Sequence, residues 1–270
     1  MKRKGFFKRV REAYRESSKS IFIVYIVLRI LVIGVMIRQS MLGNYDNVLL
    51  CLITLIMFTV PYFINKTFKI EIPDLFQIII LIFIFAAEIL GEMESYYVNI
   101  AHFDTVLHTI TGFLAAAVGF ALTDLLNNNS KKINLSPFYL ALVSFCFSMT
   151  VGALWELYEF GMDNLFDRDM QKDRIINKIN TVTMDPLQDN NVISFEDIEK
   201  SVIYHRDDDK YIVTTIEGGY LDIGIIDTMK DLLVNFIGAL VFSIFGALYV
   251  NNRDKYKFVE KFTIKKVNSI

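Results

Sequence analysis

The sequence has few of the residues that build thiolate, zinc-protease or nucleophile sites. Its 270 residues include two cysteines and three histidines. It contains no CxxC, HExxH or G-x-S-x-G motif and no glycine-rich phosphate loop, so metal centres and hydrolases that depend on those motifs are not indicated. Both cysteines, Cys51 and Cys146, lie inside long apolar runs, and we therefore expect no structural disulfide.

Long apolar runs are what the sequence does have. Hydrophobic residues make up 53% of the chain, with 23 Phe, and the mean hydropathy is +0.39. Six runs approach the length of about 20 residues that a helix needs to cross ~30 Å of hydrocarbon. We therefore predict an all-α polytopic membrane protein with six transmembrane helices. The runs are residues 21–37, 48–64, 75–90, 106–126, 137–160 and 228–250.

The basic residues predict the orientation of these helices in the plasma membrane. The first 20 residues carry eight Lys or Arg against two Glu, and residues 251–270 carry six against two acids. Because Lys and Arg are enriched in cytoplasmic segments, we expect both basic termini, 1–20 and 251–270, in the cytoplasm. Basic residues next to membrane spans more often set topology or touch anionic lipid than bind nucleic acid, so we predict the lipid bilayer and no nucleic acid as partners. Protein partners are not indicated.

One connection is too long and too polar to be a simple loop. Helices 1–5 occupy residues 21–160 and helix 6 residues 227–250, which leaves residues 161–226 as a predicted extracytoplasmic cap. The cap and Asp227 contain 15 acids against seven Lys or Arg. SVIYHRDDDKYIVTTI, residues 201–216, predicts a β-hairpin around an acidic turn. SFEDIEKS, residues 194–201, predicts a short capped helix, which would make the insertion a small α+β element.

Charged side chains gather at the predicted outer ends of helices 4, 5 and 6. Ionisable groups inside a membrane cost about 2.5–3.5 kcal/mol each on insertion scales, so their positions are informative. On each helix the polar residues are three or four apart and share one face. Because the helices alternate in direction, all of these groups fall at the same depth, and we expect them to converge on one site. They are Asp104 and His108, Glu156 and Glu159, and Asp227 and Asp231.

The chemistry of this set favours a divalent cation. Five carboxylates at low dielectric repel one another, so we expect protonation, nearby bases or metal ions to offset their charge. Oxygen ligands with one imidazole suit Zn, Mn, Mg or Fe. We predict Asp104, His108, Glu156 and Asp231 as metal ligands and Glu159 and Asp227 as catalytic residues, acting as a general base or as support for the ligands. Asp104 and Asp227 also suit the start of a helix as plain caps, which is the structural alternative.

Three ordered motifs carry a family resemblance. They are D-x3-H-x3-G-F at 104–113, E-x2-E with aromatic neighbours at 155–160, and D-T-x2-D-x6-G-A-L at 227–240. In this order they resemble the YjdF-like family of bacterial inner-membrane proteins, which is distantly similar to VanZ-like membrane proteins. The resemblance implies a helical fold in the membrane and supplies no activity. Members of that family join the second and third motifs by a short loop, whereas this chain inserts the acidic segment.

Three functions are consistent with this pattern. The first is a metal-dependent hydrolase or transferase that acts on a lipid or lipid-linked substrate at the outer leaflet. The second is a transporter of protons or divalent cations, although the inner halves of the last three helices offer few polar groups. The third is a noncatalytic sensor or partner-binding protein that uses the insertion for recognition.

Overall fold

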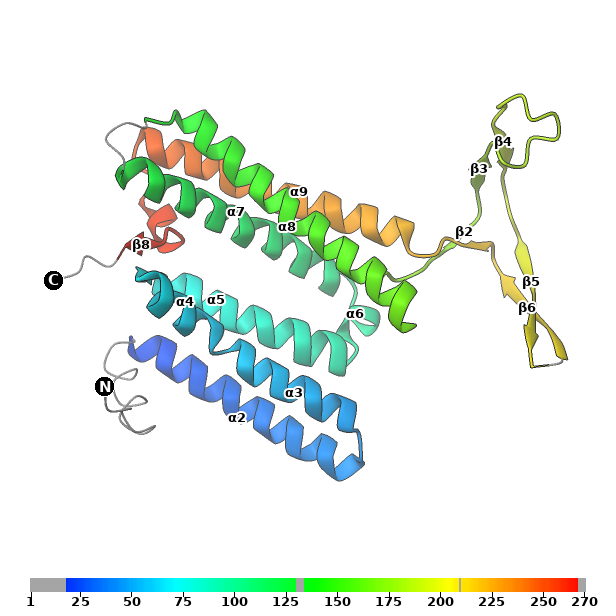
Figure 1. The fold of residues 1–270 in the computed structure, drawn as a ribbon, viewed down its shortest axis with the longest axis horizontal. Coiled ribbons are helices and arrows are strands. Elements are labelled where there is room, and N and C mark those ends of the chain that lie inside the picture. Colours follow the sequence, from blue (N-terminus) through cyan, green and yellow to red (C-terminus); the bar gives the residue numbers. More distant parts are fainter. Residues whose placement is uncertain (1–17, 130–133, 209, 267–270) are drawn as a thin grey trace. The chain divides into compact units, whose positions relative to one another are not determined.

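The computed structural model describes residues 18–129, 134–208 and 210–266. Six helices in these residues are long and apolar enough to cross a membrane, which confirms the predicted number of spans (Figure 1). Each helix extends beyond its apolar run, because flanking polar residues continue the helical backbone. The spans are Lys19–Leu42, Tyr45–Phe68, Asp74–Met93, Phe103–Asn127, Pro137–Phe166 and Ile225–Asn251.

The first three spans pack around a common apolar core. Helix α2 (Lys19–Leu42) lies against α3 (Tyr45–Met57) and α5 (Asp74–Phe85). The second span is broken: α3 ends before Phe58, and α4 (Val60–Phe68) begins with Pro61 in its first turn. Proline has no backbone N–H and favours a helix start, which explains the interruption. The buried members of this core are Leu28, Val32, Cys51, Phe58, Leu81, Ile84 and Ile89.

The third span ends in an unusual helical turn. Residues Ala86–Met93 form a π-helix, η1, and the backbone N–H of Glu94 donates to the carbonyl of Ile89 five residues earlier. Gly91 lies directly under the ring of Tyr97, so close that a Cβ would fall 2.4 Å from that ring. The short helix α6 (Tyr96–Asn99) then leads into α7. The wider turn and the glycine therefore bring an aromatic side chain against the end of this span.

The last three spans are α7 (Phe103–Asn129), α8 (Pro137–Phe166) and α9 (Ile225–Asn251). Small residues let α7 and α9 approach at backbone distance. A Cβ on Gly112 would lie 2.1 Å from the carbonyl oxygen of Asn235, and one on Gly238 would lie 2.1 Å from that of Thr109. Small residues permit such close helix packing in membranes. Gly112 and Gly238 therefore allow the close packing of α7 against α9.

Serine hydroxyls join α8 to the same interface. Ser148 Oγ donates to the carbonyl of Gly112 at 2.7 Å, and Ser144 Oγ donates to that of Ala116 at 2.7 Å. Further along, Ser243 Oγ on α9 lies 3.2 Å from Ser144 Oγ. Polar side chains that bond across helices in this way contribute roughly 1 kcal/mol each. The buried serines of this half of the bundle therefore hold helices together.

The chain after α9 packs back onto the bundle. The 3₁₀ segment η2 (Lys257–Lys261) buries Val259 completely, and the Phe262 ring lies 5.2 Å from that of Phe113. Strand β8 (Lys265–Lys266) then pairs antiparallel with β1 (Ile70–Glu71), which lies between α4 and α5. The sequence predicted only a basic tail here. The apolar residues that the basic composition obscured are the buried Val259 and Ile264 and the partly buried Phe262.

Residues Ala153–Leu233 form a separate compact unit, and its strands pair in three short antiparallel ladders. The predicted hairpin is confirmed by eight paired positions, from Lys200 with Glu217 to Asp207 with Lys210. The strands are β2 (Ile175–Ile176) with β7 (Tyr220–Leu221), β3 (Ile179–Thr181) with β4 (Ile193–Phe195), and β5 (Lys200–Asp207) with β6 (Lys210–Glu217).

The predicted short helix at residues 194–201 is wrong. Ser194 and Phe195 belong to β4, and Lys200 begins β5. Between them Asp197 has φ of 52°, a left-handed conformation that a helix does not contain. Strand pairing at both ends leaves too few residues for a helix, so tertiary pairing overrides the local capping pattern.

Carboxylates organise the loops of this unit by accepting backbone N–H groups. Asp185 accepts from Leu187 at 3.2 Å and from Asp189 and Asn191 at 3.0 Å each. The hydrogen bond from Asn191, with help from the other two, lowers the pKa of Asp185 below its ordinary value. Asp185 therefore stabilises the conformation of residues 185–191 through these three hydrogen bonds.

Asp222 has the same role at the base of the insertion. Burial by itself raises the pKa of Asp222, but hydrogen bonds from the backbone N–H groups of Arg174, Ile226 and Gly224 outweigh it and lower the pKa overall. This carboxylate thus ties the chain before β2 to the start of α9.

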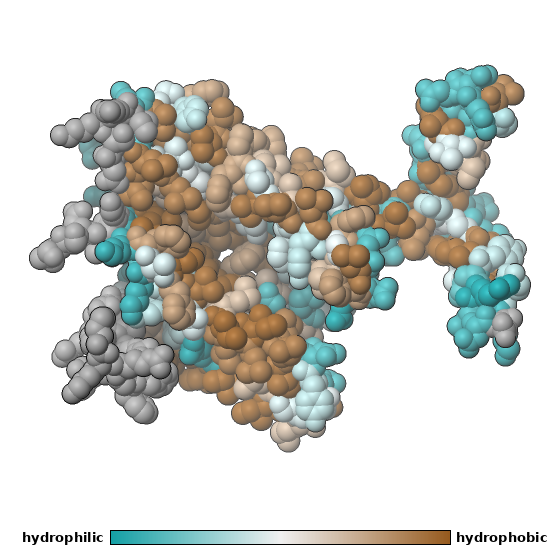
Figure 2. Space-filling view, viewed as in Figure 1, coloured by the Kyte–Doolittle hydropathy of each residue, from teal (hydrophilic) through white to brown (hydrophobic). Residues whose placement is uncertain are grey.

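Apolar side chains cover the outside of the helices. Figure 2 shows brown, hydrophobic residues over much of the helical surface, whereas teal residues are prominent at the tip of the β5–β6 hairpin. On α2 alone Ile23, Ile30 and Ile37 are each more than half exposed. Apolar surface of this extent needs a covering, and hydrocarbon of a bilayer supplies it.

The close contact of α7 and α9 predicts a strong response to added methyl groups. Gly112→Ala and Gly238→Ala should each destabilise the protein by about 1–3 kcal/mol, because the new Cβ overlaps a backbone carbonyl. Gly34→Ala is the control, since no atom lies within 4 Å of the Cβ position at Gly34. Thermal unfolding in detergent measures the effect. Equal melting temperatures for all three variants would contradict this packing.

The Asp185 loop predicts a pH response with a defined direction. Because its pKa is lowered in the folded state, the hydrogen bonds of Asp185 contribute stability above the ordinary Asp pKa of about 3.9, and that stability is lost as pH falls through the lower folded value. Amide NMR of selectively labelled Leu187 in the full chain reports this titration. A midpoint at or above that of an exposed Asp would contradict the assignment.

Candidate metal site at the start of α7 and α9

Contacts along α7 and α9 set the relative height of their polar residues. Gly112 contacts Asn235, and Phe120, two turns later in α7, contacts Gly246 and packs against Tyr249. The two helices therefore run in the same direction. His108 lies one turn before Gly112, and Asp231 lies one turn before Asn235 on the uninterrupted helix α9. Helical periodicity thus places the imidazole and the carboxylate at the same level and toward the same interface.

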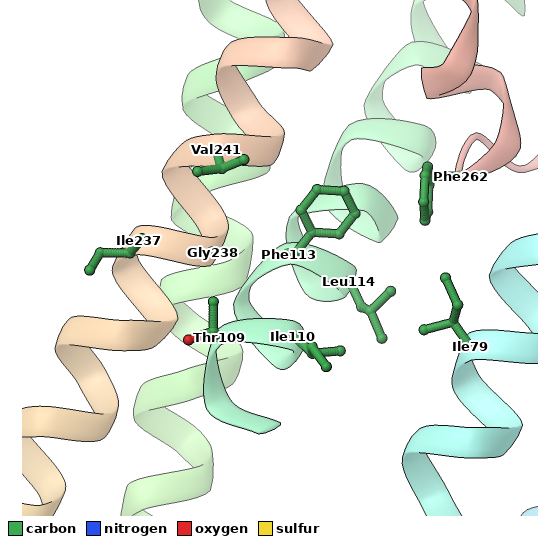
Figure 3. Close-up of a pocket in the computed structure, with 9 residues that line it drawn as sticks. All are labelled: Ile79, Thr109, Ile110, Phe113, Leu114, Ile237, Gly238, Val241 and Phe262. Atoms are coloured by element: carbon green, nitrogen blue, oxygen red, sulfur yellow. The ribbon is translucent and has the colours of Figure 1, made fainter. Parts of the chain in front are cut away.

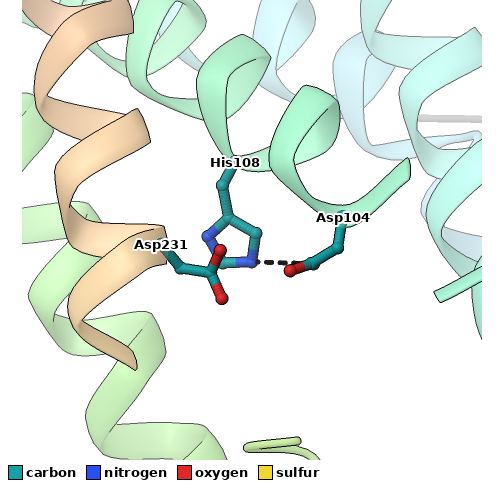
Figure 4. Close-up of side chains that lie close together, drawn as sticks. All are labelled: Asp104, His108 and Asp231. Atoms are coloured by element: carbon teal, nitrogen blue, oxygen red, sulfur yellow. Dashed lines mark ion pairs between the residues drawn. The ribbon is translucent and has the colours of Figure 1, made fainter. Parts of the chain in front are cut away.

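Side-chain positions agree with this register. His108 Nε2 lies 3.4 Å from Asp104 Oδ1, and one ligand atom from each of Asp104, His108 and Asp231 lies within 4.8 Å of the others (Figure 4). The Asp104 side chain is 22% exposed and that of His108 13%, while Asp231 is 2% exposed. The cluster is therefore open to its surroundings at Asp104 and closed at Asp231.

The cluster is somewhat wider than the ligand set of a single bound divalent cation. Donors on opposite sides of one ion at bond lengths of about 2.1 Å are about 4.2 Å apart. Three donors cannot all lie opposite one another and are about 3.0–3.6 Å apart, so the three groups would move inward by about 1–2 Å to share one ion. Two carboxylates and a neutral imidazole would balance a charge of 2+, and the donor set suits Zn, Mn, Mg or Fe.

The two glutamates on α8 are also buried. Glu156 is 5% exposed and Glu159 is 8% exposed. Glu159 Oε1 accepts a hydrogen bond from the Trp155 indole N–H at 2.7 Å. Among the described residues, the group whose ligand atoms lie within 4.8 Å of one another consists of Asp104, His108 and Asp231. The assignment of Glu156 as a ligand therefore remains a prediction.

Asp227 holds the loop that follows α8. Its Oδ2 accepts the backbone N–H of Lys172 at 3.0 Å, and its Oδ1 lies 3.3 Å from Arg174 Nη2. Asp163, near the end of α8, holds the same loop by accepting the N–H groups of Met170 and Gln171. These contacts give Asp227 a structural role in its loop, and the catalytic role expected for it stays a prediction. Sequence spacing pointed to Asp227 but carried no signal for Lys172 or Arg174 as its partners.

Arg29, the one basic residue near the middle of the first span, makes local contacts. It donates to the carbonyl of Leu55 at 3.5 Å, and its guanidinium lies 4.3 Å from the centre of the Tyr25 ring. No ion pair of Arg29 with an acid occurs in the part of the chain that the structure describes. A carbonyl and an aromatic face thus stabilise this charge within the first three spans.

The contacts of Asp227 predict a structural effect of its removal. Asp227→Ala should leave the Lys172 N–H and the Arg174 guanidinium without their acceptor, at a cost of about 1–3 kcal/mol. Limited proteolysis should then cut residues 167–174 faster than in the parent. Asp169→Ala, at a surface carboxylate of the same loop, is the control. Unchanged cleavage in Asp227→Ala would show that the carboxylate does not hold this loop.

Comparisons with known proteins place the chain in a family. Residues 21–190, more than half of the chain, match the model of a family described as predicted membrane protein, DUF2238. The matched residues include Asp104, His108, Glu156 and Glu159 and end before Asp227 and Asp231. No curated protein and no solved structure matches the chain. The protein belongs to the DUF2238 family of predicted membrane proteins.

Proposed function

We propose that the protein is a metal-dependent hydrolase or transferase that acts on a lipid or lipid-linked substrate at the outer leaflet of the plasma membrane. One observation carries the proposal: Asp104, His108 and Asp231 offer ligand atoms within 4.8 Å of one another at the ends of two membrane helices. Ionisable groups are costly there and are retained where they serve a function. The resemblance to YjdF-like and VanZ-like proteins agrees with the membrane location and remains a prediction.

Helix register supports Glu156 as a fourth ligand. Ser148 and Gly152 on α8 face the α7–α9 interface, since Ser148 bonds to Gly112 and Gly152 contacts the Asn235 side chain. Glu156 is one turn beyond Gly152 on the same helix and shares that face. With the buried Glu156 carboxylate the site would have four protein donors, as closed metal sites do. Displacement of one donor would leave a coordination position for the substrate.

The remaining residues would move protons and shape the site. A bound divalent ion would polarise a phosphoryl or acyl oxygen of the substrate. In hydrolysis, the water oxygen forms a bond to that phosphorus or carbon while the bond to the leaving oxygen breaks, and the leaving oxygen receives the proton that the water gave to the general base. We assign the general base, which takes the proton of the water, to Glu159. Asp227 would position the loop 167–174 beside the start of α9 and leave the chemistry to the other carboxylates.

Two features support an enzyme over a transporter. The buried hydroxyls of Ser144 and Ser148 donate to backbone carbonyls, so they are engaged in helix packing. A transport pathway needs polar groups along its length that are available to the moving ion. The site instead lies at one end of α7 and α9, as expected for a pocket reached from one side. If the purified protein contained no metal, a noncatalytic sensor would be the better supported function.

The proposal predicts stoichiometric metal in the purified full-length protein. His108→Gln and Asp104→Asn should each weaken metal affinity by more than about tenfold, because each removes a ligand. Elemental analysis after dialysis against a metal-buffered solution measures this loss. Glu94→Gln is the matched control, since Glu94 is an exposed acid paired with Arg38 and lies outside the cluster.

A correctly folded parent protein without metal would overturn the proposal. Thermal unfolding and size-exclusion profiles of the same samples report whether each variant is folded. Equal metal content in the parent and both ligand variants would place the metal elsewhere and would overturn the assigned ligands.

A further inference from the structure

An apolar pocket lies directly beyond the candidate metal site. It has a volume of about 440 Å³ and opens between α5, α7 and α9 (Figure 3). Its walls are apolar side chains together with Gly238 and Thr109, and the Thr109 hydroxyl already donates to the carbonyl of Thr105 at 2.7 Å. The remaining lining residues are Ile79, Ile110, Phe113, Leu114, Ile237, Val241 and Phe262.

The position of the pocket along the membrane span favours hydrocarbon as its occupant. Thr109 to Leu114 lie about 9 to 17 Å along α7 from its first residue, at 1.5 Å per residue. This is within the apolar part of a membrane span. A buried water needs two to four polar partners, and these walls offer none that is available. The pocket therefore stays dry and is filled by apolar groups.

The pocket is also accessible from the bilayer. Ile237 and Val241, which form its α9 wall, are 47% and 41% exposed, so this wall reaches the surface that lipid covers. At the opposite end, Phe262 of the segment after α9 closes the pocket by packing on Phe113. An acyl chain that enters between the helices would therefore contact the rings of Phe113 and Phe262 at the closed end of the pocket.

The relation between pocket and polar cluster identifies the occupant. Thr109 follows His108 directly, and Gly238 lies two turns beyond Asp231 on α9. An amphiphile whose oxygen-rich head lies at Asp104 and His108 would extend its tail along α7 into the pocket. We propose that the pocket binds one acyl chain of a lipid whose polar head lies at the Asp104–His108–Asp231 cluster. This proposal rests on the proposed function and specifies its substrate as a chain-bearing lipid.

Photo-crosslinking tests the occupant in the intact protein. The full chain is placed in nanodiscs that contain a trace of phosphatidic acid with a diazirine near the end of one acyl chain. After illumination, peptide mass spectrometry should find adducts concentrated on Phe113, Leu114 and Val241. Adducts spread evenly over the exposed apolar residues of all six spans would overturn the proposal.

Filling the pocket provides the matched variants. Leu114→Trp and Val241→Trp add bulk from opposite walls and should reduce adducts in the pocket. If the added Trp displaces about two methylene groups of the acyl chain from the pocket, we expect adducts there to fall about tenfold. Leu240→Trp is the control, because Leu240 is the neighbour of Val241, is similarly exposed and lies outside the pocket lining. An equal loss in Leu240→Trp would overturn the proposal.

Metal content of the same samples separates the two proposals. We expect both filling variants to retain metal, because neither residue is a ligand. Metal binding with adducts scattered over the surface would overturn the acyl-chain site alone. Adducts in the pocket of a metal-free parent would support the acyl-chain site and overturn the metal-dependent function. If one filling variant does not fold, the other, from the opposite wall, still gives the comparison.

Discussion

The contact between the backbones of α7 and α9 is the constraint on which the candidate site depends. At Gly112 and at Gly238 the backbone of the other helix lies so close that a Cβ would overlap its carbonyl oxygen. Because a helix is rigid over a few turns, this contact fixes the height of every residue on either side of it. His108 and Asp231 lie close together because they are one turn before Gly112 and Asn235, which contact each other. The acid–imidazole cluster is thus a consequence of small residues a turn away.

The same interface explains why the polar groups of the bundle separate into two classes. Toward the middle of the helices, the hydroxyls of Ser144 and Ser148 are used for packing against carbonyls of α7. At the start of α7 and α9, carboxylates and an imidazole replace hydroxyls, and these groups can change charge or bind a cation. The transition occurs within about two helical turns. Packing and chemistry are therefore adjacent but distinct parts of one face.

The membrane fold and the main polar residues could be predicted from sequence because the signals are local. Apolar length defines a span, and spacing of four places Asp104 beside His108. Register between helices depends on which surfaces pack, so spacing within α8 alone could not show whether Glu156 reaches the same site. The loop contacts of Asp227 involve Lys172 and Arg174, which are more than 50 residues away in sequence. No local pattern encodes such a pairing.

Other differences between expectation and structure have similar causes. The π-helical turn at Ala86–Met93 has ordinary helical composition, so its wider hydrogen bonding could not be predicted from local sequence. The short helix expected at 194–201 had an adequate cap pattern, but strand pairing of Phe195 and Lys200 prevailed. In the apolar pocket between α5, α7 and α9 each residue taken alone is of a type common in membrane spans. Its shape exists only where α5, α7, α9 and Phe262 come together.

The segment after α9 has a consequence for how the protein is made. Val259 and Phe262 complete the core around Phe113, and β8 pairs with β1 between the second and third spans. Ribosomal synthesis delivers these residues only after all six spans. The pairing of β1 with β8 and the packing of Val259 therefore cannot form until translation has passed the sixth span. Final closure is in this respect a late step of biogenesis.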